Sequence, residues 1–150
     1  MIELRRESAD GAAARTLFAE YMALVLERLG PGFEPTADIF ATESDFSAFL
    51  VVYDDGAPVA CGGLRPVEPG TGEIKRMFVT ASARRRGHAR RLLGELEAIA
   101  RDAGVRRILL YTTGVLDEAL RLYASAGYER LATRDAGERT DFWLEKRLAG

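Results

Sequence analysis

Apolar residues recur at two spacings along the chain, and the spacing predicts where helices and strands lie. Over residues 12–29 and 88–103 they return every three or four positions, which is the period of a helix with one buried face. The same period predicts a third helix between Asp117 and Gly127. Short apolar or alternating runs predict strands at residues 2–7, 49–53, 58–66, 73–79, 107–112, 128–133 and 140–147.

The order of these elements predicts a mixed α+β fold in a single domain that spans residues 1–150. The strands between residues 49 and 79 follow one another through short turns, so we expect them to be antiparallel. Residues 73–112 form a strand–helix–strand unit and predict a parallel pair. Two glycines inside a strand, Gly62 and Gly63, indicate a bulge or a close approach of the backbone. Residues 33–46 fit either a helix or a loop.

Composition limits the classes of function. The chain has 150 residues, of which 47% are hydrophobic and 29% charged, as in ordinary soluble domains. The net charge of −2 argues against a nucleic-acid binder and requires any basic site to be local. A single cysteine and a single histidine exclude an intrachain disulfide and argue against a metal site. No apolar run approaches the ~20 residues that span a bilayer, so we expect a cytoplasmic protein without a membrane partner.

Three consecutive arginines, Arg84–Arg86, precede Gly87 where the second helix is predicted to begin. A helix N-terminus binds anions because its first N–H groups are unpaired and the helix dipole is positive there. Glycine allows the backbone to curl closely around a ligand. The turn therefore indicates a phosphate-bearing ligand, and its alternative is a solvated basic helix start.

Two motifs at fixed spacing give the chain a family resemblance. They are Arg84-x-x-Gly87-x-Ala89 and Leu122-Tyr123-x-x-x-Gly127-Tyr128, and both follow the strand that begins at Glu73. In this order they resemble the GNAT superfamily of acetyl-CoA-dependent N-acetyltransferases over roughly residues 50–132. The resemblance implies a mostly antiparallel sheet of six to seven strands, helices on both faces and a V-shaped splay between the central parallel strands.

The resemblance also implies acetyl-CoA as the cosubstrate. Main-chain groups around Met77 and Val79 would pair with its pantetheine arm, and the amides of residues 85–90 would hold the pyrophosphate. Side chains of Arg84–Arg86 could reach the 3′-phosphate. We expect the His88 imidazole to be exposed to solvent, and Asp117 to be either a pantetheine contact or a helix cap. The predicted cosubstrate-binding residues are Met77, Phe78, Val79, Arg84, Arg85, Arg86, Gly87, His88, Ala89, Arg90 and Asp117, and no metal is expected.

Two residues are the candidate catalytic groups, Glu73 and Tyr123. An alkylammonium holds its proton at neutral pH, and a carboxylate near the cleft can accept that proton. Glu73 occupies the position where several family members carry this general base, and Tyr123 matches the family's general acid for the leaving thiolate. The alternatives are a structural ion pair of Glu73 with Lys75 or Arg65, and a core tyrosine at position 123.

Strand alternation assigns side chains of the strand 73–79 to opposite faces. It predicts one face with Glu73, Lys75, Met77 and Val79, and the other with Ile74, Arg76 and Phe78. Cys61 is interpreted as a small buried residue, because no partner that would activate its thiol is evident. The family resemblance instead implies direct acetyl transfer in a ternary complex.

The acceptor is expected to be a primary amine of a small molecule or peptide. Two segments near the expected acceptor site are acidic, which slightly favours a cationic amine. Their residues are Glu27, Phe33, Glu34, Asp38, Phe40 and Glu43 in the first, and Asp135, Glu138 and Asp141 in the second. An amino-acid acceptor would require an arginine for its carboxylate, and Arg65 is the candidate. A non-catalytic acyl-CoA-binding module is the alternative function, and residues 128–147 could pair in a homodimer.

Overall fold

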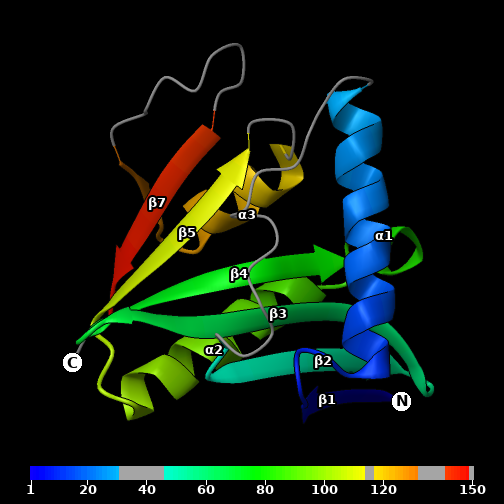
Figure 1. Ribbon diagram of the computed structural model, residues 1–150, viewed down its shortest axis with the longest axis horizontal. Helices are drawn as coiled ribbons and strands as arrows, with labels where there is room; N and C mark the ends of the chain where they lie inside the picture. The colour runs from blue at the N-terminus through cyan, green and yellow to red at the C-terminus, as the bar shows by residue number, and fades with distance from the viewer. Residues whose placement is uncertain (31–45, 114–116, 132–140, 149–150) are drawn as a thin grey trace.

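A computed structural model describes residues 1–30, 46–113, 117–131 and 141–148 of the protein (Figure 1). Its described strands form one seven-stranded sheet in the order β1-β2-β3-β4-β5-β7-β6. In chain order the elements are β1 (Ile2–Arg6), α1 (Ala12–Leu29), β2 (Ala48–Asp54), β3 (Ala57–Glu68), β4 (Thr71–Val79), α2 (His88–Asp102), β5 (Arg107–Thr113), α3 (Asp117–Ser125), β6 (Glu129–Arg130) and β7 (Asp141–Arg147). Neighbouring strands are antiparallel except β4 and β5, which are parallel. The predicted α+β class is therefore confirmed.

Helices pack against both faces of this sheet (Figure 1). On one face, Leu17 of α1 is buried against residues of β2, β3 and β4, among them Val51 and Phe78. On the other face, α2 buries its apolar stripe, which includes Leu92 and Leu96, against the sheet. The two apolar clusters together give the sheet a core on each side, as its alternating strand residues require.

The parallel pair separates along its length. β4 and β5 are paired from Thr71 with Arg107 to Ile74 with Leu110. Beyond this point β4 remains paired with β3 as far as Val79, while β5 remains paired with β7 as far as Thr113. Figure 1 shows the two arrows diverging toward their tips. The predicted V-shaped splay between the central parallel strands is confirmed.

A bulge interrupts β4 just beyond Ile74, the last residue of β4 that pairs with β5. The register with β3 shifts between Cys61 and Gly63, and Arg76 has a φ of 59°, in the left-handed region. A bulge adds one residue to a strand, so side chains beyond it change faces. The predicted alternation is therefore wrong: Met77 packs with Ile74 in the α2 cluster, not on the face opposite to it. Val79 packs there too, whereas Phe78 belongs to the α1 cluster.

The glycines of β3 explain how the sheet accommodates this bulge. A side chain at Gly62 would collide with the sulfur of Met77, and one at Gly63 would collide with the ring of Phe46. Glycine is favoured at both positions because a larger residue would displace the side chains that lie over the backbone. The predicted close approach at these glycines is confirmed, and the bulge lies opposite them in β4.

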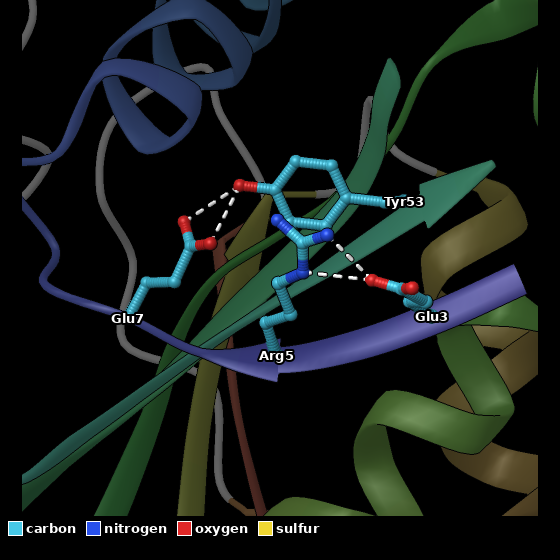
Figure 2. Close-up of polar contacts among 4 residues, drawn as sticks. All are labelled: Glu3, Arg5, Glu7 and Tyr53. Atoms are coloured by element: carbon cyan, nitrogen blue, oxygen red, sulfur yellow. Dashed lines mark hydrogen bonds and ion pairs between the residues drawn. The ribbon is translucent and has the colours of Figure 1, made fainter. Parts of the chain in front are cut away.

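The edge strand β1 is tied to β2 by a polar cluster of Glu3, Arg5, Glu7 and Tyr53 (Figure 2). The Tyr53 hydroxyl donates to Glu7 at 2.6 Å, and Arg5 Nε donates to Glu3 at 2.8 Å. The Arg5 guanidinium also lies 4.4 Å from the centre of the Tyr53 ring. Charged side chains on an edge strand oppose pairing with another chain, and we assign this cluster a structural role.

A buried carboxylate joins α2 to the end of the sheet. Glu97 is 5% exposed and accepts hydrogen bonds from Lys146 Nζ at 2.8 Å and from the Tyr128 hydroxyl at 3.1 Å. Replacing it with alanine leaves both donors without their acceptor, so we expect Glu97→Ala to lower the free energy of unfolding by about 2–4 kcal/mol. Urea unfolding measures the change. Glu95→Ala, at an exposed position of the same helix, is the control, and an equal effect of both would contradict the prediction.

Candidate active site

A cavity of about 560 Å³ lies at the splay and is called here the splay cavity. Its lining comes from α1, the end of β4, the turn before α2, the start of α2, and α3. Among the residues predicted from the sequence, it brings together Met77, Phe78, Val79, Arg84, Arg85, Gly87, His88, Ala89, Arg90 and Tyr123. The predicted phosphate turn and the candidate acid Tyr123 thus line one cavity.

The N-terminus of α2 forms the basic side of the splay cavity. Gly87 precedes the helix with a φ of 82° and ψ of 9°, and no described side chain caps this end. The first amides of the helix therefore lack the side-chain acceptor that many helices provide. Arg84, Arg85 and Arg90 add positive charge to the lining. Arg90 also donates to Ser125 Oγ at 2.6 Å, which links α2 to α3.

Helices from opposite faces of the sheet meet across the splay. Arg28 of α1 and Glu118 of α3 form an ion pair of 2.7 Å, and both line the cavity. Partial burial raises the pKa of Glu118, but a backbone hydrogen bond and Arg28 outweigh it, so the pKa lies below its usual value. Tyr21 of α1 also lines the cavity, with its ring centre 5.8 Å from that of Phe78. Sequence reasoning missed these α1 residues because their contact with α3 depends on the gap between β4 and β5.

Tyr123 reaches the cavity from the buried face of α3. It is 4% exposed, and its ring packs edge-on against Tyr128 with centres 6.1 Å apart. Burial is the main cause that raises the pKa of Tyr123 above its ordinary value, and Tyr21 adds to it. The phenol is therefore protonated at neutral pH and can donate a hydrogen bond into the cavity.

Alkaline pH should destabilise the protein through its buried tyrosines. Burial raises the pKa of Tyr21, Tyr123 and Tyr128 above the ordinary value of 10. Above that value the unfolded chain loses these protons first, so the free energy of unfolding falls as pH rises from about 10 to 12. Urea unfolding across this range, together with phenolate absorbance, measures the effect. Full ionisation of all tyrosines near pH 10 with the fold intact would contradict it.

The structure corrects the expectation for His88. Its side chain is buried at 6% exposure, not open to solvent, and no described residue forms a hydrogen bond with Nε2. The physical reason is helical spacing: His88 lies one turn before Leu92 and two turns before Leu96, so it continues the buried stripe of α2.

Two predicted residues with described side chains, Glu73 and Arg86, lie outside the lining of the splay cavity. Glu73 is 5% exposed, and its Oε1 lies 3.6 Å from the Arg65 guanidinium, which is the ion pair considered as its alternative role. Arg86 points toward the β2–β3 turn, where its guanidinium lies 3.5 Å from Asp54. The side chain of Asp117 lies outside the described residues.

Cys61 is buried, as interpreted from the sequence. Burial raises the pKa of its thiol to about 12, and the thiol donates to the main-chain oxygen of Arg76 at 3.4 Å. A protonated buried thiol is a poor nucleophile. Within the described segments, no three His, Cys, Asp or Glu side chains gather as a metal site would require, and no helix is long and apolar enough to cross a membrane.

Comparison with known proteins supplies the family. The model of the acetyltransferase (GNAT) family matches residues 15–128, which is more than half of the chain. The chain belongs to the GNAT family. The chemistry of GNAT acetyltransferases is acyl transfer from an acyl-CoA, which agrees with the phosphate turn and the splay described above.

Individual GNAT relatives match this chain by sequence or by fold. An "IAA acetyltransferase" of Azospirillum brasilense is 41% identical over 81 residues, which cover 53% of this chain and 53% of that protein. The chain thus spans about half the length of this relative. A crystal structure of a putative acyl-CoA N-acyltransferase from Klebsiella pneumoniae has a TM-score of 0.81 at 24% identity, over 99% of both chains.

A second GNAT structure contains the expected cosubstrate. It is an acetyltransferase of Elizabethkingia anophelis with acetyl-CoA bound, and it matches with a TM-score of 0.73 at 16% identity over 98% of both chains. At this level of identity the likeness shows the shared fold.

Proposed function

We propose that this GNAT protein transfers an acetyl group from acetyl-CoA to a primary amine of a small molecule or peptide, with both substrates bound at once. The observation that carries the proposal is the splay cavity, which joins an uncapped helix N-terminus to a buried tyrosine. The first feature suits a pyrophosphate, and the second suits a leaving thiolate.

The residues present fit acetyl-CoA. Amides at the start of α2 and the side chains of Arg84 and Arg85 would hold its phosphates. On the β5 side, β4 has no ladder partner among the described residues beyond Ile74. Main-chain groups of Met77 and Val79 would pair there with the pantetheine amides, in the manner of an added strand. Acetyl-CoA would supply an activated thioester to this site.

The remaining chemistry is assigned to three groups of the chain. Glu73 would accept a proton from the attacking amine, directly or through water. A main-chain N–H near Phe78 would polarise the thioester oxygen. Tyr123 would donate its proton to the departing sulfur of coenzyme A. Holding the amine and the thioester together removes the entropic cost of their encounter.

Two measurements test the proposed function. Calorimetry with acetyl-CoA tests binding, and release of coenzyme A in the presence of an amine panel tests transfer. We expect both binding and amine-dependent release. Binding without release for any amine would instead support the acyl-CoA-binding module, and absence of binding would overturn the proposal.

A glycine substitution tests the phosphate turn. Gly87→Ala places a side chain at a φ of 82°, which an L-residue adopts at a cost, so the turn relaxes away from the ligand-binding geometry. We expect the Kd for acetyl-CoA to rise roughly 3- to 10-fold. Gly94→Ala on the same helix meets no atom within 4 Å and is the matched control. Equal Kd values for both variants would contradict the assignment.

The acceptor preference drawn from acidic segments stays a prediction, because residues 31–45 and 132–140 lie outside the described parts of the chain. The homodimer through residues 128–147 is likewise a prediction, and light scattering after gel filtration tests it. Charged side chains of the described residues also bear on the chemical class of the acceptor.

A further inference from the structure

The face of β3 and β4 that α1 covers carries positive charge beside Glu73. Arg65 of β3 lies opposite Glu73 in the strand register, and Arg76 follows on β4. Arg76 lies on the α1 face, because its guanidinium stacks on Phe18 of α1. Arg65, Arg76 and Glu73 thus lie on the same face of the sheet.

The bulge in β4 positions Arg76. A residue other than glycine with a φ of 59° is held there at a cost, and bulges beside active sites redirect side chains. The Arg76 guanidinium lies 4.3 Å from the ring centre of Phe18 and 5.3 Å from that of Phe46. Two aromatic rings therefore hold the planar guanidinium in place.

The Arg76 guanidinium lies close to the splay cavity. The Phe18 ring centre is 6.4 Å from that of Tyr21, and Tyr21 lines the cavity together with Phe78. Arg76 is therefore one aromatic ring away from the cavity lining. A small acceptor bound beside Phe18 and Tyr21 would place one end near this guanidinium.

The contact between Arg65 and Glu73 is a second observation that indicates a ligand with a carboxylate. Their closest atoms are 3.6 Å apart, which is longer than a charge-assisted hydrogen bond. Arg65 Nε is buried and forms no hydrogen bond with any described residue. A ligand with an ammonium next to a carboxylate would complement both groups, with the ammonium toward Glu73 and the carboxylate toward Arg65.

We propose that the acceptor is an amino acid or a similarly small amine with a carboxylate, which Arg76 and Arg65 hold while Glu73 receives the ammonium. The guanidinium fork suits this role because it can donate two parallel hydrogen bonds to one carboxylate. The inference rests on the proposed acetyltransferase function and names the class of its acceptor.

Matched amine pairs test the substrate class. L-Phenylalanine is compared with phenethylamine, L-leucine with 3-methylbutylamine, and L-lysine with 1,5-diaminopentane; within each pair only the carboxylate differs. We expect kcat/KM, from coenzyme A release, to favour the carboxylate member by roughly tenfold or more in at least one pair. Equal or higher values for the decarboxylated member in every pair would overturn the proposal.

A second readout covers the case in which no probe is turned over. The Tm of the protein saturated with coenzyme A is measured with each probe, because an acceptor that binds the folded state raises it. The proposal is also overturned if no carboxylate member raises the Tm more than its decarboxylated partner does. Failure of the proposed function is distinguishable, since it appears as absent acetyl-CoA binding in calorimetry or as binding without coenzyme A release for any amine of the panel.

Variants of Arg76 separate recognition from structure. We expect Arg76→Gln to lower kcat/KM for the carboxylate member more than for its decarboxylated partner, so that the preference between them shrinks. Arg76→Lys should restore part of the preference, because it keeps the charge without the fork. Arg106→Gln, at an exposed position before β5, is the control. An equal loss for both members of a pair would show a structural role and overturn the assignment.

Discussion

Replacing Tyr123 with phenylalanine should lower kcat roughly 100- to 1,000-fold and leave the Kd for acetyl-CoA within about twofold. The variant removes one hydroxyl and keeps the ring that packs against Tyr128. The lost group is needed only when negative charge develops on the sulfur, so its loss affects the transition state more than binding. Steady-state kinetics and calorimetry measure the two constants.

The neighbouring tyrosine provides the control for this variant. Tyr128→Phe also removes a buried phenol, but the Tyr128 hydroxyl bonds Glu97 and does not belong to the lining of the splay cavity. Its effect should be on stability, with kcat near that of the wild type. Weaker acetyl-CoA binding with an unchanged kcat for Tyr123→Phe would show that Tyr123 is a binding residue and not the acid.

Replacing Glu73 with glutamine should lower kcat/KM roughly 100-fold at neutral pH, and the loss should shrink as pH rises. The carboxylate contributes most while the amine carries its proton, because that proton must leave before the nitrogen can attack. Above the pKa of the amine, solvent has already removed that proton, so the variant and the wild type converge. A pH profile of kcat/KM for both proteins measures the effect.

The pH profile also distinguishes the two roles considered for Glu73. A carboxylate that only pairs with Arg65 would leave a loss that is the same at every pH, because misplacement of Arg65 does not depend on protonation of the amine. Glu68→Gln, at an exposed position of β3, is the control for removal of a negative charge near the sheet edge. Urea unfolding of Glu73→Gln shows whether stability contributes.

The spacing of apolar residues predicted the helices and strands because it reflects which side chains of each element are buried. The limits of α1 are those expected from its apolar spacing, Ala12–Leu29, and the strand–helix–strand unit gave the parallel pair. The first feature is local, and the second follows from the rule that a helical crossover joins parallel strands. The glycines at 62 and 63 were informative for the same reason, since each forms part of a single strand.

The features that the sequence did not reveal depend on contacts between distant segments. An arginine at 76 carries no sign that its φ is positive, so the reversal of faces in β4 could not be predicted. The ion pair of Arg28 with Glu118 requires two helices on opposite faces to meet through the splay. The expectation of an exposed His88 was wrong because it followed from the polarity of the imidazole and not from its position on the buried stripe of α2.

The splay also divides the sheet mechanically. β1 to β4 form one part and β5 to β7 the other, and the ladder between β4 and β5 joins them only from Thr71 to Ile74. A molecule that pairs with the open edge of β4 would add hydrogen bonds between the two parts of the sheet while it is bound. Occupancy of the cavity would then slow amide exchange across both strand tips, so the same ligand would serve as reactant and as part of the scaffold.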